Sequence, residues 1–213
     1  SGFVHPVYTP SGRIVTNDVP AGHTHQHALM FAWTSAQIDG RPVDFWNSHQ
    51  RQGHIEHLRT IHASDGLIVT VLHHVDDTRA TPTPVLVETW QLAHVPHTTM
   101  HVFDLISTQV CIMQRPLVIE EYHYGAMGIR GAEAFENGAE MLTSEGHDRV
   151  SGNHTTAKWA ALSGEVDGAI CGIAALGHPQ NFRAPQPVRL HPDAPYFCFA
   201  PMIQGRFEIT PGE

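Results

Sequence analysis

Short hydrophobic runs, many with polar residues at alternate positions, recur along the chain and are separated by turns rich in glycine, proline and aspartate. Runs of this length and period predict β-strands. Turn signals such as Asp167-Gly168 between consecutive runs are typical of antiparallel hairpins. The pattern predicts an all-β, antiparallel β-sandwich. The expected strands cover residues 13–19, 28–34, 55–62, 67–75, 85–94, 99–110, 117–124, 155–162, 169–176 and 196–200.

One stretch departs from this pattern. Residues 131–151 are polar and glycine-rich, and they have no sustained period of two or 3.6. We expect a long loop there, of the kind that often carries function on a rigid sheet. No repeat, linker or change in composition indicates a second domain, so we expect a single β-sandwich domain over residues 1–213.

The first chemical pattern is three histidines at alternate positions, His23, His25 and His27, which run directly into the hydrophobic residues of 28–34. On a strand, alternate side chains share one face, so three imidazoles would lie at the open end of the core. Two of them could bind one divalent ion, with a further ligand from a distant residue. The same spacing also fits pocket histidines without a metal, and structural histidines. The candidate distant ligands are Glu121, His123, His154 and His178.

A second pattern follows the hydrophobic residues at the start of 117–124. Glu121 and His123 would share one strand face, about 7 Å apart, while Tyr122 and Tyr124 would share the other. A carboxylate and an imidazole at this spacing could form an acid/base couple or half of a metal site. The tyrosines, with Trp33 and Trp46 near the first histidines, could present ring faces to a ligand.

A third pattern lies in the proline-rich residues 177–201. This density of proline disfavours a regular strand ladder, so His178, Asn181 and Arg183 should lie on a rigid connection. The planar guanidinium of Arg183 could hold a sugar hydroxyl or a carboxylate. An arginine that hydrogen-bonds loop carbonyls would be equally ordinary.

Composition narrows the class of partner. The 213 residues include 12 Lys and Arg against 21 Asp and Glu, and no basic run, which disfavours nucleic-acid binding. No stretch approaches the roughly 20 apolar residues of a membrane span, so we expect a soluble protein, either cytoplasmic or exported. The three cysteines are widely separated in apolar surroundings and are expected to be buried free thiols.

Several longer motifs resemble a known family. The segments VHPVYTPSGRIVTNDVPAGHTHQHALMFAW, DFWN, EYHYG, IRG, LTSEGHDR and GHPQNFRAPQPVRLHPDAPYFCFAP are similar to the bacterial family labelled PmoA-like, after a methane mono-oxygenase subunit. That subunit lies in a membrane, whereas this sequence has no membrane span. The resemblance implies a fold related to the galactose-mutarotase-like supersandwich. It also implies that the segment is incomplete at both ends.

The resemblance favours a carbohydrate-active enzyme of the epimerase, lyase or hydrolase type, acting on a sugar, a keto-sugar or an oligosaccharide. Glu121 would be the base, His123, His25 or His178 the acid, and Arg183 an anchor. The alternatives are a carbohydrate-binding accessory domain without turnover, and a metal-dependent oxygenase or hydrolase that uses a divalent ion at the first histidines. The expected substrate-binding residues are Trp33, Trp46, Tyr122, Tyr124, Asn181 and Arg183.

Overall fold

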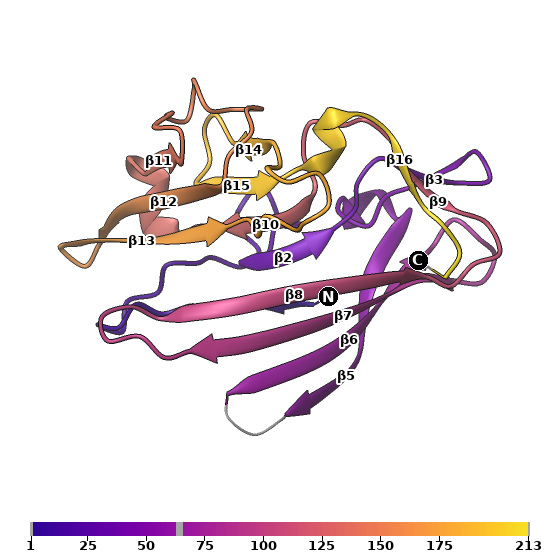
Figure 1. Cartoon of the computed structure of the whole chain (residues 1–213), viewed down its shortest axis with the longest axis horizontal. Helices are drawn as coiled ribbons and strands as arrows, with labels where there is room; N and C mark the ends of the chain where they lie inside the picture. The colour runs from indigo at the N-terminus through magenta and orange to yellow at the C-terminus, as the bar shows by residue number, and fades with distance from the viewer. Residues whose placement is uncertain (1, 63–65, 213) are drawn as a thin grey trace. The chain divides into compact units, whose positions relative to one another are not determined.

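The computed structural model describes residues 2–62 and 66–212, and it is an all-β protein (Figure 1). Its strands pair in antiparallel sheets, as the sequence predicts. Helical structure in the described residues is limited to the short 3-10 segments η1 (Ser48–Gln50), η2 (Glu133–Asn137) and η3 (Pro201–Gln204). Within these residues, we find no helix with the length and apolar character of a membrane span.

The chain divides into two compact units, each assembled from segments that are distant in sequence. Unit 1 comprises residues 1–2, 32–120 and 206–213, and unit 2 comprises residues 3–31 and 121–205. Each unit is compact by itself. The single domain over residues 1–213 that the sequence predicts remains a prediction.

Unit 1 contains two four-stranded sheets. One is a meander of long strands, in the order β5 (Gly53–His62), β6 (Leu67–Asp76), β7 (Thr83–Val95) and β8 (Val102–Cys111). These four strands confirm four of the predicted hydrophobic runs. The other sheet has the order β16 (Phe207–Ile209), β9 (Leu117–Ile119), β3 (Ala36–Ile38) and β4 (Arg41–Val43).

The meander contains a buried polar network around Glu88, which has no exposed surface. One carboxylate oxygen of Glu88 accepts hydrogen bonds from Trp90 Nε1 (2.6 Å), Ser107 Oγ (2.5 Å) and Gln109 Nε2 (3.2 Å). The other lies 2.8 Å from His74 Nε2. Adjacent strands therefore share a carboxylate whose oxygens are both hydrogen-bonded, as a buried charge requires.

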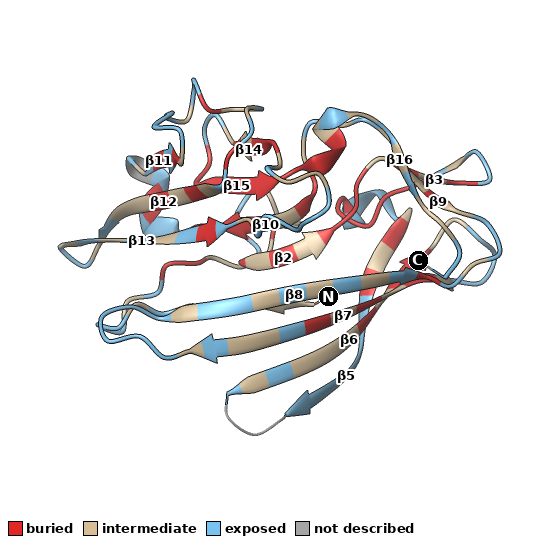
Figure 2. Cartoon of the chain, viewed as in Figure 1, coloured by how far each residue is buried: buried red, intermediate tan, exposed pale blue. Residues whose placement is uncertain are grey.

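Unit 2 is a sandwich of two sheets. The first has the order β1 (Phe3–Val4), β2 (Leu29–Ala32), β10 (Ala126–Arg130), β15 (Tyr196–Phe199) and β14 (Val188–Leu190). The second has the order β11 (Glu140–Thr143), β12 (Trp159–Val166) and β13 (Ala169–Leu176). Both sheets contribute to one core, with Ile129 and Phe197 from the first and Met141 and Leu162 from the second. Figure 2 shows β15 buried along its length, consistent with its place between β10 and β14.

The hairpin between β12 and β13 confirms the turn predicted at Asp167-Gly168. Asp167 has φ 48° and Gly168 has φ 74°, the positive values that two-residue hairpin turns require.

Three expected elements are wrong. Residues 13–19 form only isolated bridges, at Ile14 and Thr16. The strand expected over 117–124 ends at Ile119, and Gly125 and Ala126, where β10 begins, have positive φ. The loop expected over 131–151 contains η2 and β11.

The cysteine prediction is largely confirmed. Cys111, Cys171 and Cys198 are all free. Cys111 and Cys198 are buried, whereas Cys171 is half-buried.

Candidate functional site

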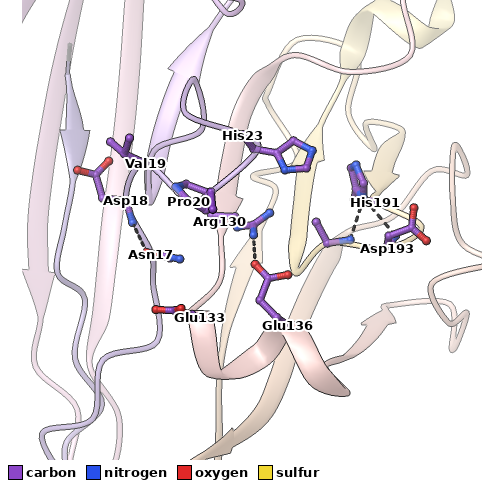
Figure 3. Close-up of a pocket in the computed structure, with 12 residues that line it drawn as sticks. Asn17, Asp18, Val19, Pro20, His23, Arg130, Glu133, Glu136, His191 and Asp193 are labelled. Carbon is purple, nitrogen blue, oxygen red and sulfur yellow. Dashed lines mark hydrogen bonds and ion pairs between the residues drawn. The ribbon is translucent and has the colours of Figure 1, made fainter.

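Unit 2 contains an open pocket of about 640 Å³ (Figure 3). It joins three remote parts of the chain: the loop before β2, the end of β10 with η2, and the turn between β14 and β15. Its lining combines four carboxylates with two imidazoles and one guanidinium. The lining residues are Asn17, Asp18, Val19, Pro20, Ala21, His23, Arg130, Glu133, Glu136, His191, Asp193 and Ala194.

Arg130, the last residue of β10, is a buried cation with only 1% of its surface exposed. Its Nη1 donates to Gln26 Oε1 at 3.1 Å, and its Nη2 forms an ion pair with Glu136 (Figure 3). Burial lowers the pKa of Arg130, and the charge of Glu136 opposes that shift. The pairing with Glu136 therefore stabilises the charged guanidinium in an otherwise unfavourable environment.

Gly131 sets how closely this part of the chain approaches the core. A Cβ at Gly131 would lie 2.3 Å from Leu162 Cδ2 and 2.9 Å from a ring carbon of Phe135. No side chain fits there without a shift of the neighbouring residues. Glycine after Arg130 thus lets the chain pass directly from β10 into η2, which carries Glu136.

His191 has a defined hydrogen-bonding state. Its Nδ1 accepts the backbone N–H groups of Ala194 (2.9 Å) and Asp193 (3.2 Å). Burial, followed by the charge of Arg189, lowers the pKa of His191 from 6.5 to about 4. At neutral pH the ring is uncharged, and because Nδ1 is an acceptor its proton lies on Nε2. His191 is therefore a neutral N–H donor.

His23 lies beside His191 in the pocket, with ring centroids 5.6 Å apart (Figure 3). The ring of His25 lies 6.0 Å from that of His23. These three imidazoles come together across a sequence separation of more than 160 residues, because the turn after β14 meets the loop before β2.

The strand predicted through His23, His25 and His27 is wrong. The segment forms turns, in which His23 N–H donates to Pro20 O (3.0 Å) and Gln26 N–H donates to His23 O (2.8 Å). His27 lies 2.5 Å from Asp18 Oδ1 and stacks on Phe3. The turns disrupt the alternation that would have placed the three imidazoles on one face.

The expected divalent-metal site has no support in the geometry. Across residues 2–62 and 66–212, no group of three or more His, Cys, Asp or Glu side chains is arranged to hold a metal ion. His191 is also unsuited as a ligand. A metal-bound histidine normally donates its other ring N–H, whereas the remaining nitrogen of His191 accepts two hydrogen bonds.

A second group of rings lies in the same unit, and we call Tyr122, His123, Tyr124 and His154 the ring row. The ring centroids of Tyr122 and His123 are 4.4 Å apart, those of His123 and Tyr124 4.8 Å, and those of His123 and His154 6.3 Å. The two histidines are exposed and the two tyrosines are half-buried. Partial burial, followed by the charge of Arg189, lowers the pKa of both histidines.

Tyr196 is a buried residue beside the pocket. Its ring lies 6.4 Å from that of His191. Burial raises the pKa of Tyr196, and Tyr124 contributes to the same shift. Arg189 lies close enough to lower the pKa of His191 as well as those of the ring-row histidines. The pocket and the ring row therefore both lie close to β14, since His154 N–H donates to Val188 O and His191 follows Leu190.

Other predicted site residues lie elsewhere. Glu121 and His178 are exposed and do not line the pocket. Arg183 Nη1 donates to the backbone carbonyls of Pro201 (2.9 Å) and Gly205 (2.5 Å), which is the structural alternative that the sequence left open. Asn181 is exposed in the same loop, where its N–H donates to His178 O.

The two predicted tryptophans belong to unit 1, and both are buried. Trp33 Nε1 donates to Gln109 Oε1 at 2.6 Å, and its ring contacts that of Phe207. Trp46 is 1% exposed and follows Asp44, whose carboxylate accepts the Trp46 backbone N–H. Neither tryptophan presents an open ring face.

The sequence reasoning missed Arg130, Glu136, His191 and Asp193. Arg130 and His191 both lie within motifs that support the family resemblance, IRG and RLHPDAPY. Neither residue stands at a sequence spacing from another polar residue that would indicate a shared site. The proline after His191 was a usable signal, because it favours the turn that brings Asp193 and Ala194 to the ring.

Comparison with known proteins gives a family without an assigned activity. Residues 1–213 match the model described as "Family of unknown function (DUF6807)". No curated protein and no solved structure matches the chain significantly.

Proposed function

The chain belongs to the DUF6807 family, and we propose that it is a carbohydrate-active enzyme whose pocket in unit 2 performs acid/base chemistry on a sugar or keto-sugar. The observation that carries this proposal is the state of His191: a neutral imidazole, fixed as an Nε2–H donor, in a pocket that also contains carboxylates. Acid/base sites characteristically contain titratable groups whose pKa values are moved apart by their surroundings.

His191 supplies the donor. A neutral imidazole N–H polarises a carbonyl or ring oxygen without bringing a positive charge into the pocket. The hydrogen bonds from Asp193 and Ala194 keep the ring orientation fixed. This pre-organisation favours a developing negative charge on the substrate oxygen.

We assign Glu133 as the proton acceptor. Glu136 also lines the pocket, but its carboxylate is already engaged in the ion pair with Arg130. Glu133 is exposed on the same 3-10 turn. Glu121, the base expected from the sequence, does not line the pocket, so Glu133 replaces it in this proposal.

The pocket's hydrogen-bonding groups suit a polyol. Its carboxylates accept hydrogen bonds from hydroxyl groups, and His191 donates to an oxygen. Val19, Pro20 and Ala21 add a small apolar wall that a C–H face could contact.

The test is incubation of the purified chain with a panel of neutral sugars, keto-sugars and glycosides in D₂O. NMR would follow anomeric exchange, deuterium incorporation beside a carbonyl, and bond cleavage. We expect conversion of one class, with a loss of about 10²-fold or more in His191→Gln and in Glu133→Gln. His147→Gln and Glu140→Gln change exposed residues of unit 2 outside the pocket and should retain the rate.

Binding without conversion would replace the enzyme with a carbohydrate-binding module. Equal rates in the His191→Gln variant and in the control variants would remove the assignment of this pocket.

A further inference from the structure

We propose that the ring row is a second sugar-binding subsite, so that the ligand of unit 2 is a neutral disaccharide or longer oligosaccharide rather than a single sugar. This inference rests on the proposed function, which places the reacting sugar unit in the pocket. It adds a subsite on Tyr122, His123, Tyr124 and His154 for the adjoining unit.

The contacts within the ring row support a built surface. The ring of Tyr122 contacts those of His123 and Tyr124, with centroids 4.4 and 4.9 Å apart, at interplanar angles of 40° and 67°. His123 and Tyr124 are nearly perpendicular, at 83°. Rings that pack at such angles hold one another in place, while the exposure of the row leaves part of its surface open.

The chemistry of these rings fits a sugar. A tyrosine combines an apolar ring with a hydroxyl, and an uncharged imidazole combines an apolar ring with one donor and one acceptor. The C–H face of a pyranose can pack on such rings while its hydroxyls form hydrogen bonds at their edges.

The local charge disfavours other ligands of aromatic surfaces. Aromatic clusters often bind cations, but Arg189 lies close enough to influence both ring-row histidines, and its positive charge would repel a cation. Nucleic-acid bases also stack on such rings, but the chain's formal charge of -9 opposes a phosphate backbone. A neutral, hydroxyl-rich ligand avoids both penalties.

The position of the ring row gives the subsite its direction. The backbone N–H of His154 donates to Val188 O, at the start of β14, and His191 directly follows Leu190, the last residue of this three-residue strand. A ligand with one unit beside His191 can therefore extend along β14 toward the ring row.

His154 is held in this arrangement at a conformational cost. Its φ of 65° is uncommon for a residue other than glycine, and its backbone N–H donates to Val188 O at 2.7 Å. This bond fixes the backbone of His154 beside β14, and its ring lies 6.3 Å from that of His123.

The test compares the affinities of the whole chain for a neutral disaccharide and for its constituent monosaccharide, by calorimetry. We expect the disaccharide to bind about tenfold more tightly or better, and Tyr122→Ala to abolish that difference without weakening monosaccharide binding. Tyr122→Phe keeps the ring and should retain most of the difference. Tyr8→Ala removes a tyrosine of unit 2 that is 47% exposed and outside the row, and it serves as the matched control.

Histidine NMR provides a readout in the unmodified chain. The ring signals of His123 and His154 should shift on titration with the disaccharide and remain in place with the monosaccharide. This measurement stays informative even if Tyr122→Ala fails to fold.

Each outcome is decisive. Equal affinity for the two sugars, or ring signals that do not respond to the disaccharide, would overturn the subsite while leaving the proposed function intact. A disaccharide advantage that depends on Tyr122, without any conversion of sugar, would support the subsite and overturn the enzyme. A response to adenosine instead of to any sugar would overturn both.

Discussion

His74 Nε2 lies 2.8 Å from Glu88 Oε2, and neither side chain has exposed surface. Glu88 also accepts bonds from Trp90, Ser107 and Gln109 through its other oxygen. This carboxylate is therefore the common acceptor for four side chains of unit 1. Replacing it with an amide forces an N–H₂ group against at least one existing donor.

We expect Glu88→Gln to lower the free energy of unfolding by about 1–3 kcal/mol, and Glu88→Ala by about 3–5 kcal/mol. Denaturant titration followed by tryptophan fluorescence measures both. Glu56→Gln, which changes an exposed carboxylate on the neighbouring part of the same sheet, should cost less than about 0.5 kcal/mol. Equal effects of Glu88→Gln and Glu56→Gln would show that the network contributes little.

His191 should make the chain less stable in mild acid. Its pKa is lowered to about 4, so between roughly pH 6.5 and 4 the unfolded chain binds a proton that the folded chain does not. Stability that is present above pH 6.5 is therefore lost as the pH falls through this window. The full shift corresponds to about 3 kcal/mol, which solvent screening of a half-buried ring reduces to about 1–2 kcal/mol.

The pKa values of His123 and His154 are also lowered, so these two residues likewise make the folded chain less stable as the pH falls. Unfolding midpoints measured from pH 7.5 to 4.5 test this prediction, with His191→Gln expected to flatten the dependence. An NMR titration in which His191 becomes protonated near pH 6.5 would contradict it.

The ion pair between Arg130 and Glu136 gives a third prediction. Glu136→Gln leaves a guanidinium that is 1% exposed without its carboxylate, and we expect a loss of about 2–4 kcal/mol in unfolding free energy. Glu133→Gln, in the same 3-10 turn, should change stability by less than about 0.5 kcal/mol because Glu133 is exposed. Thermal unfolding of the two variants makes the comparison. A similar melting temperature for both would mean that Arg130 does not depend on Glu136.

The chain is also expected to be insensitive to chelation. Within the described ranges there is no group of three metal-binding side chains, and the acceptor role of His191 Nδ1 disfavours metal binding through its other nitrogen. EDTA should therefore leave the melting temperature unchanged. A fall on adding EDTA that zinc reverses would show that a bound ion stabilises the fold.

The long strands of unit 1 were predictable because their pattern is local. Hydrophobic alternation over β5 to β8, and the turn signal before β13, depend only on neighbouring residues. The short strands β10, β11 and β14 carry too few residues to show a period, and their pairing partners stabilise them. The strand predicted through His23, His25 and His27 was wrong for a related reason. The alternation of these residues fits a strand, but the backbone hydrogen bonds of the segment form turns.

By itself, the sequence determined the antiparallel all-β class, the free cysteines and the kinds of side chain available for chemistry. It also identified His23 and His25 as candidate site residues, and His23 lines the pocket of unit 2. Only the tertiary structure decided that His23, with His25 beside it, lies next to His191, and that Arg130 forms an ion pair with Glu136. It also decided that the Arg183 guanidinium donates to backbone carbonyls of a loop. The physical reason is that strand formation depends on local periodicity, whereas the protonation and partners of a side chain depend on burial and on residues brought close by folding.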